Sequence, residues 1–183
     1  KEINMKILDN TIQDYTGTNF SVYKREEGET IIKYNTSGDI IENNEMYSKV
    51  MLGKCETCNP FYKNSFEGFT YDKVLVVGLG LGLVPYELSE VNGCSKIDVL
   101  EIDQEIIDYT ILSGHLNSDI NLIQGDIYNY TTTETYDLII IDTIWYAHEM
   151  SNEDCELLKS RLLPNINTGG ALYFPIKEKF IIR

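Results

Sequence analysis

Residues 73–82 read Lys-Val-Leu-Val-Val-Gly-Leu-Gly-Leu-Gly, an apolar run that passes into three glycines at alternate positions. Such a run is typical of a buried strand. Gly78, Gly80 and Gly82 allow a tight turn that brings the backbone close to a ligand. The next apolar run ends at Glu101, where a strand-end acid holds a ribose in nucleoside-binding folds. The two features together predict a nucleoside-binding α/β domain.

The chain from residue 71 onward alternates between strand and helix patterns. The expected strands are 73–78, 96–101, 120–124, 136–142, 170–176 and 179–183, and the expected helices are 82–92, 103–116 and 151–163. This order predicts a Rossmann-like, doubly wound and mostly parallel sheet, because helical crossovers connect parallel strands. Asp103 and Ser151 suit helix N-caps, and the pair Gly169-Gly170 is expected to break the chain before the fifth strand.

Residues 1–70 do not show the alternating strand and helix pattern of the rest of the chain. Short β-prone segments at 20–23, 30–34 and 39–42 are separated by turn residues, and helical spacing favours a short helix at 45–53. We therefore expect a small β-rich N-terminal extension or lid at 1–70, followed by the Rossmann-like domain at 71–183.

The composition restricts the partners. The chain carries 15 basic and 29 acidic side chains, a formal net charge of -14. A basic stripe is absent, which disfavours nucleic acid. The negative surface would attract a cationic substrate such as an amine, although the same charge also maintains solubility. The sequence shows no membrane-spanning run and no signal-peptide pattern at its first residues, so we expect a cytoplasmic protein.

The cysteines and histidines give no metal pattern. Cys55 and Cys58 form a single CxxC pair, and the second pair that a zinc ribbon needs is missing. His115 and His148 are not spaced like a metal-binding pair. We expect reduced thiols in a loop and no metal site.

The glycine spacing distinguishes between nucleoside cofactors. The third glycine comes one residue earlier than in the GxGxxG pattern of dinucleotide sites, which favours S-adenosylmethionine over NAD. Glu101 can accept hydrogen bonds from both ribose hydroxyls, and Asp103 is the alternative if the register differs. Asp126 ends the third strand motif and can accept from an adenine amino group, with Ile127 against the ring, although Gly125-Asp126 also fits a plain turn. The expected cofactor-binding residues are Gly78, Gly80, Gly82, Glu101, Ile102, Asp126 and Ile127.

Residues 72–176 resemble the core of class I S-adenosylmethionine-dependent methyltransferases, and within that superfamily the spermidine synthase branch. The resemblance is carried by Val-Leu-Glu-Ile-Asp-Gln-Glu-Ile-Ile at 99–107, by Gly125-Asp126, and by Tyr-Asp-Leu-Ile-Ile-Ile-Asp at 136–142. It implies S-adenosylmethionine as the cofactor, group transfer to a small acceptor, and a small N-terminal sheet.

The chain also departs from that branch. Asp142 matches the first of two acids that hold the amine in aminopropyltransferases, but Trp145 stands at the second position. Residues 142–145 are distantly similar to the Asp/Asn-Pro-Pro-aromatic loop of amino methyltransferases, without either proline. The segment after the fifth strand is short, so the closing antiparallel hairpin of a seven-stranded sheet is expected to be missing or abbreviated. A partner subunit or a second copy would then cover the exposed edge, or the chain is a minimal variant.

Asp142 is expected to orient or deprotonate an amine or hydroxyl acceptor. Trp145 and Tyr146 are expected to wall the acceptor site, where an aromatic face suits a cation, although Trp145 also fits a packing role. His148 is a further candidate base. Three alternatives stay open: a module that binds an adenosyl ligand without chemistry, an aminopropyltransferase, and an NAD-linked oxidoreductase.

Overall fold

The computed structural model describes residues 13–24, 30–36, 40–43, 71–90, 94–114, 116–143, 150–174 and 179–183. In chain order the elements are β1 (Tyr15–Thr16), β2 (Phe20–Lys24), β3 (Thr30–Tyr34), β4 (Ile40–Asn43), β5 (Lys73–Val77), α4 (Leu83–Glu90), β6 (Lys96–Glu101), α5 (Gln104–Ser113), β7 (Ile120–Gln124), β8 (Tyr136–Ile141), α6 (Asn152–Leu162), the 3-10 helix η2 (Leu163–Asn165), β9 (Ile166–Phe174) and β10 (Lys179–Ile182).

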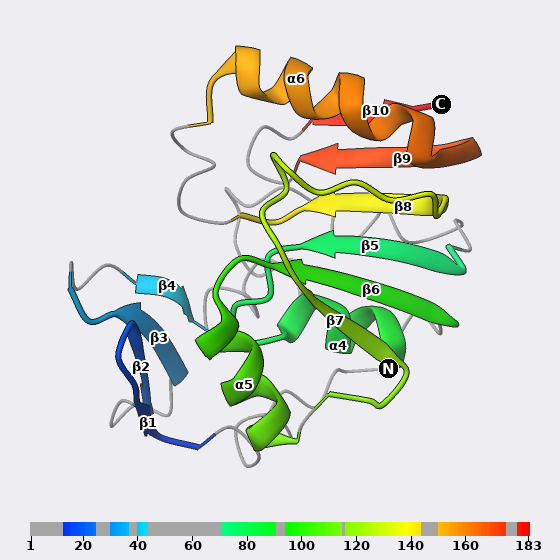
Figure 1. Ribbon diagram of the computed structural model, residues 1–183. Coiled ribbons are helices and arrows are strands. Elements are labelled where there is room, and N and C mark those ends of the chain that lie inside the picture. Colours follow the sequence, from blue (N-terminus) through cyan, green and yellow to red (C-terminus); the bar gives the residue numbers. More distant parts are fainter. Residues whose placement is uncertain are drawn as a thin grey trace, which may run out of the picture.

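The larger sheet is six-stranded, in the order β10-β9-β8-β5-β6-β7 (Figure 1). Strands β5 to β9 run parallel, and β10 pairs antiparallel with β9. The predicted Rossmann-like, mostly parallel sheet is therefore confirmed. The chain proceeds from β5 to β6 and β7 on one side, then returns to β8 on the other side of β5. Such a switch point leaves a crevice at the carboxyl ends of the strands, where ligands bind in open α/β sheets.

Helices cover both faces of this sheet. Val74 and Val76 of β5 belong to a buried cluster that includes residues of α4 and α5. Leu75 and Val77 belong to a second cluster, which includes residues of α6. The alternation along one strand follows from the two-residue period of a strand, and it explains why the run at 138–141 is apolar at every position.

The helix caps follow the sequence signals. Asp103 caps α5 and accepts from the backbone N–H of Glu105, while Gly114 ends the helix with φ 64°. Ser151 caps α6 through a capping box with Asp154, in which each side chain accepts from the other's backbone N–H. Both predicted caps are confirmed.

The glycine pair before the expected fifth strand behaves differently from the prediction. Gly169 and Gly170 lie inside β9 and do not precede it. The register of β8 with β9 shifts between Tyr136 and Leu138, and Gly169 has φ 82°. A Cβ on Gly170 would lie 2.7 Å from the carbonyl oxygen of Asp137. The glycines therefore accommodate an irregularity inside a longer strand, which a turn signal alone does not distinguish from a chain break.

The N-terminal strands form a four-stranded antiparallel sheet in the order β1-β2-β3-β4. It lies beside α5 (Figure 1), and Phe20 and Val22 are buried in the same hydrophobic cluster as Val74 and Val76. The β-rich character of the extension is confirmed for these strands. The helix expected at 45–53 lies outside the described residues, and the boundary near residue 70 stays a prediction.

Candidate functional site

The glycine loop after β5 is a tight turn at the carboxyl end of the central strand. Gly78, Gly80 and Gly82 all have positive φ, at 100°, 50° and 75°. A Cβ on Gly78 would lie 2.3 Å from the carbonyl oxygen of Asp142, so only glycine allows the ends of β5 and β8 to approach this closely. The N–H of Gly82 donates to the carbonyl of Leu79 over 2.7 Å, just ahead of α4. The loop thus places backbone amides and a helix start at the switch point.

Glu101 ends β6 beside this loop with only 7% of its surface exposed. Its carboxylate accepts from the N–H of Leu79 and from the N–H of Asp103, each over 2.9 Å. Burial raises the pKa of Glu101, and the backbone donors of Asp103, Leu79 and Ile102 oppose that shift. The sequence predicted this acid at the carboxyl edge of the sheet, and the structure has it there between the glycine loop and the start of α5; its role toward a ribose stays a prediction.

Ile102 follows Glu101 and turns outward, with 64% of its surface exposed. It contributes to a shallow groove at the start of α5, whose lining residues are Thr18, Asn19, Ile102, Asp103, Gln104, Glu105 and Asp108. The groove combines an exposed aliphatic side chain with polar and acidic groups. Ile102 is thus the apolar member of a mostly polar and acidic groove.

Asp126 and Ile127 follow β7 at the same edge. The N–H of Gly125 donates to the carbonyl of Glu101 over 2.9 Å, which ties the two strand ends together. The Asp126 carboxylate accepts from the N–H of Tyr128 and the side-chain amide of Asn129, each over 2.9 Å. Ile127 is buried among the residues that pack against α6. In the structure Asp126 therefore organises its own turn, and its role toward adenine stays a prediction.

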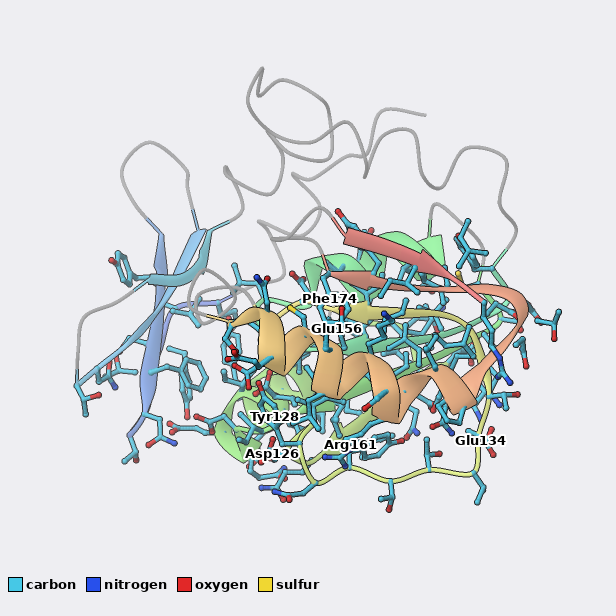
Figure 2. All side chains as sticks on the ribbon, turned by 90° about the horizontal axis from the view of Figure 1, so that it is seen from above. Asp126, Tyr128, Glu134, Glu156, Arg161 and Phe174 are labelled. Carbon is cyan, nitrogen blue, oxygen red and sulfur yellow. The ribbon has the colours of Figure 1, made fainter. Side chains whose placement is uncertain are left out.

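The Arg161 side chain of α6 contacts the turn that follows Asp126. Arg161 donates from its guanidinium to the carbonyl oxygens of Tyr128 and Tyr130, the latter over 3.2 Å. Figure 2 labels Arg161 together with Asp126 and Tyr128. The loop after β7 is thus tied to α6, against which Ile127 also packs.

Asp142 follows β8 at the centre of the carboxyl edge. Its N–H donates to the carbonyl of Val77 over 2.8 Å. Burial raises the pKa of its carboxyl to about 7, because the charged form is poorly solvated there. The neighbouring Thr143 hydroxyl is buried, and no residue in the described part of the chain forms a hydrogen bond with it. Trp145, Tyr146 and His148 lie outside the described residues, as do Cys55, Cys58 and His115.

Sequence reasoning missed the contacts of Glu105. This first-turn residue of α5 accepts from the N–H groups of Thr18 and Asn19 and from the hydroxyl of Tyr15. The partners come from the N-terminal sheet, more than 80 residues away in the chain. A glutamate in a first helical turn is expected for the helix dipole alone, so no local signal indicated this role.

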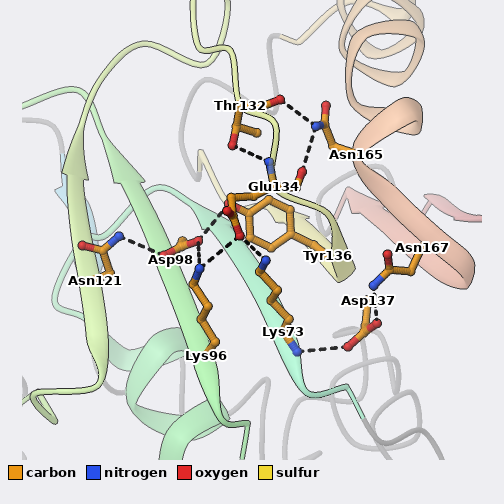
Figure 3. A network of polar contacts seen from close by, with 10 residues as sticks. All are labelled: Lys73, Lys96, Asp98, Asn121, Thr132, Glu134, Tyr136, Asp137, Asn165 and Asn167. Atoms are coloured by element: carbon orange, nitrogen blue, oxygen red, sulfur yellow. Dashed lines mark hydrogen bonds and ion pairs between the residues drawn. The ribbon is translucent and has the colours of Figure 1, made fainter.

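The opposite, amino-terminal edge of the sheet carries a dense polar network (Figure 3). Asp98 accepts from the Tyr136 hydroxyl over 2.8 Å and from the Asn121 amide over 2.9 Å. Glu134 pairs with the ammonium groups of Lys73 and Lys96. These polar groups satisfy one another and link the amino ends of neighbouring strands.

Several features are absent from the described part of the chain. Its residues contain no group of three or more His, Cys, Asp or Glu that could hold a metal ion. Within the same ranges Cys94 and Cys155 are free thiols. None of the helices in those ranges is long and apolar enough to cross a membrane.

Three comparisons relate the chain to known proteins. No protein-family model matches the chain. Among curated proteins, putrescine N-methyltransferase 2 of Nicotiana attenuata is 31% identical over 80 residues, which covers 39% of this chain and 22% of that protein. The chain thus spans about a fifth of the curated relative that it matches.

Solved structures resemble the fold. The DhpI–SAH complex matches with a TM-score of 0.53 at 18% identity, covering 71% of this chain and 61% of that one. The plantazolicin methyltransferase BpumL, solved with SAH and a desmethyl analogue, matches with a TM-score of 0.50 at 23% identity, covering 72% and 48%. This chain therefore has the Rossmann-like fold of class I methyltransferases. The spermidine synthase-like branch stays a prediction.

Proposed function

We propose that this chain binds S-adenosylmethionine at the carboxyl edge of the parallel sheet and transfers its methyl group to a small acceptor, for which an amine is the favoured class. The observation that carries the proposal is Glu101. A carboxylate buried at a strand end, beside a glycine loop and an outward-facing Ile102, suits a ribose with its attached base.

Two comparisons support the choice of cofactor. DhpI and BpumL, whose folds this chain shares, were both solved with SAH, the demethylated product of S-adenosylmethionine. The glycine spacing of this chain points the same way, since it lacks the third-glycine position of dinucleotide sites.

Several candidate residues would share the cofactor. The Gly78 amide donates to the Leu100 carbonyl over 2.8 Å, so Gly78 and Gly80 would serve by letting the loop backbone approach the cofactor closely. Glu101 would bind the ribose hydroxyls through the carboxylate that Leu79 and Asp103 hold in place. Ile102 would lie against one side of the adenine. When bound, the cofactor supplies a methyl group on a sulfonium, an electrophile that needs no further activation.

Asp142 is the proposed base. An amine that arrives as a cation would first give a proton to Asp142. The lone pair so freed would form the bond to the methyl carbon as the carbon–sulfur bond breaks, with that bond's electron pair staying on sulfur. A carboxyl pKa raised to about 7 suits this task, because a base works best when its pKa lies near the working pH. Positioning donor and acceptor supplies the rest, an effect that can reach roughly 7–11 kcal/mol.

The amine class of acceptor rests on charge and on one relative. A formal net charge of -14 favours a cation near the surface. The curated relative is named for a diamine acceptor. Trp145 and Tyr146 would wall the acceptor site, since aromatic faces attract cations.

Calorimetric titration with S-adenosylmethionine, SAH and NAD tests the binding step. We expect micromolar affinity for the two adenosyl compounds, loss of that affinity in Glu101→Ala, and no change in Glu153→Ala, a control at an exposed position of α6. Binding of NAD alone would overturn the proposal in favour of an oxidoreductase.

Turnover separates an enzyme from a binding module. Purified protein, methyl-labelled S-adenosylmethionine and a panel of amines should yield labelled acceptor and SAH, and Asp142→Ala and Trp145→Ala should each reduce turnover. Adenosyl binding without any transfer would favour the non-catalytic reading. Release of methylthioadenosine from decarboxylated S-adenosylmethionine would favour aminopropyl transfer.

A further inference from the structure

The turn between β1 and β2 is held against the start of α5 by one carboxylate. Thr18 and Asn19 donate their backbone N–H groups to the two oxygens of Glu105, over 2.6 and 2.8 Å. The hydroxyl of Tyr15 donates to the same carboxylate over 3.0 Å. Burial alone would raise the pKa of Glu105, but these donors outweigh it and hold the pKa below its usual value. The charged form therefore makes the contact.

The turn itself is shaped for this contact. A Cβ on Gly17 would lie 1.7 Å from a Glu105 oxygen, so a side chain at this position would displace the carboxylate from its contact. The side-chain amide of Asn35 donates to the carbonyl of Gly17 over 2.8 Å, bracing the turn from β3's end. The rings of Tyr15, Phe20 and Tyr109 pack against one another in tilted and edge-to-face arrangements, with centroid distances of 5.1 to 5.8 Å. The N-terminal sheet is thus docked on α5 by both polar and aromatic contacts.

A chain of hydrogen bonds leads from this turn to the proposed ribose site. The side-chain amide of Asn19 donates to the Asp103 carboxylate, over 3.2 and 3.4 Å to its two oxygens. The backbone N–H of Asp103 in turn donates to Glu101 over 2.9 Å. The other oxygen of Glu101 accepts from the glycine-loop residue Leu79. Thr18 and Asn19 also line the groove that Ile102 enters.

We propose that Glu105 is a positioning residue for the nucleoside site. Its carboxylate holds the Gly17–Asn19 turn, a contact called the clasp below, and the turn places Asn19 against Asp103. Asp103 in turn holds Glu101 in the geometry that binds an adenosyl group. The N-terminal sheet is then part of the cofactor site. Occupancy of that site and docking of the turn stabilise each other, since coupling between two sites is reciprocal. This inference rests on the proposed function.

The test combines SAH affinity with hydrogen exchange of the Thr18 and Asn19 amides in the full chain. In the wild type, saturating SAH should slow exchange at both amides. Glu105→Ala should speed their exchange and weaken SAH binding about tenfold. Glu105→Gln, which keeps one acceptor oxygen, should lie between. Glu153→Ala removes a first-turn glutamate from α6 and should change neither measurement.

A second variant guards against a misfolded Glu105→Ala protein. Asn19→Ala leaves the backbone of the turn intact and removes only the link to Asp103, so it should weaken SAH binding with exchange at Thr18 unchanged. Unchanged SAH affinity in both variants, with normal wild-type binding, would overturn the inference and leave the clasp as a purely structural contact. A wild type that does not bind SAH would instead overturn the proposed function and this inference with it, while the exchange rates would still report the clasp.

Discussion

The two ends of the parallel sheet use carboxylates in opposite ways. At the amino end, Asp98 is buried but accepts from the Tyr136 hydroxyl and the Asn121 amide. At the carboxyl end, Asp142 is partly buried, and burial is the cause that raises the pKa of its carboxyl. Glu101 lies at the same end and accepts from the backbone N–H groups of Leu79 and Asp103.

The pKa directions follow this contrast. At the amino end, burial would raise the pKa of Asp137, but Asn167 and the N–H groups of Lys73 and Asp72 hold it below its usual value. At the carboxyl end, burial raises the pKa of both Asp142 and Glu101. Groups that stabilise a fold are satisfied by it, whereas groups kept for a ligand are held at a cost to stability. Substitution of an acid should therefore lower the free energy of unfolding at the amino end and raise it, or weaken ligand binding, at the carboxyl end.

The largest expected effect is a gain in stability from Asp142→Asn that depends on pH. The native state raises the pKa of Asp142 to about 7, so it binds this proton more tightly than the unfolded chain does. Wild-type stability should therefore fall as the pH rises from about 4 to about 7. The variant cannot ionise, and its advantage should grow over this window toward an upper limit of about 4 kcal/mol.

Urea unfolding at pH 4, 5.5, 7 and 8.5 measures this difference. Asp119→Asn, a substitution at an exposed position, serves as the control and should show no such trend. Parallel pH profiles for the wild type and Asp142→Asn would mean that the Asp142 carboxyl is not held in a poorly solvated site.

The sequence predicted the strands of the parallel sheet and the acids at their carboxyl ends, but not the residues that contact one another across the chain. The residues at 74–77 and 138–141 are apolar without interruption, so the first run predicted a buried strand and the second a central strand covered on both faces. Glu101 and Asp142 followed, because strand ends in a parallel sheet meet at one edge. Their position required only local pattern and topology.

Long-range contacts were beyond that reasoning. Glu105 and Asn19 are 86 residues apart in the chain, and nothing in either local pattern indicates their contact. Gly169 and Gly170 predicted a break in the chain, because a pair of glycines is a local turn signal. The local sequence does not show that β8 pairs with β9 on both sides of a shift in register. For Asp126 the sequence allowed either an adenine-binding role or a place in a plain turn. In the structure its carboxylate forms hydrogen bonds within its own turn.

The second prediction concerns the amino end of the sheet, where a substitution should lower the free energy of unfolding instead of raising it. Asp98→Ala leaves the buried hydroxyl of Tyr136 and the amide of Asn121 without their acceptor, which should cost about 2–3 kcal/mol of unfolding free energy. Affinity for SAH, measured by calorimetry, should stay within twofold of the wild type. A loss of SAH binding in a variant that remains folded would show that the two ends are not independent.

Glu101→Gln sharpens the comparison from the carboxyl end. Hydrogen bonds to a charged group contribute about 1.5–3 kcal/mol, so SAH binding should weaken roughly 10- to 150-fold. Stability should fall by about 1 kcal/mol, because the amide keeps one acceptor oxygen and turns its NH2 toward the backbone N–H of either Leu79 or Asp103. Asp98→Ala should therefore lose mainly stability and Glu101→Gln mainly affinity. Equal losses of stability would remove the distinction.

The smallest expected effect comes from Tyr136→Phe, which tests whether the amino-end network acts through single hydrogen bonds. Tyr136 is fully buried, and its hydroxyl donates to Asp98 over 2.8 Å. The phenylalanine keeps the packing of the ring and the Lys73 ammonium 5.4 Å from its centroid, and Asp98 still accepts from Asn121. The loss should therefore be about 1 kcal/mol, measured by urea unfolding against Tyr128→Phe, which changes a ring that is 38% exposed. A loss as large as that of Asp98→Ala would mean that the network fails as a unit when any one bond is removed, and the amino end would then be a cooperative structure rather than a set of separate contacts.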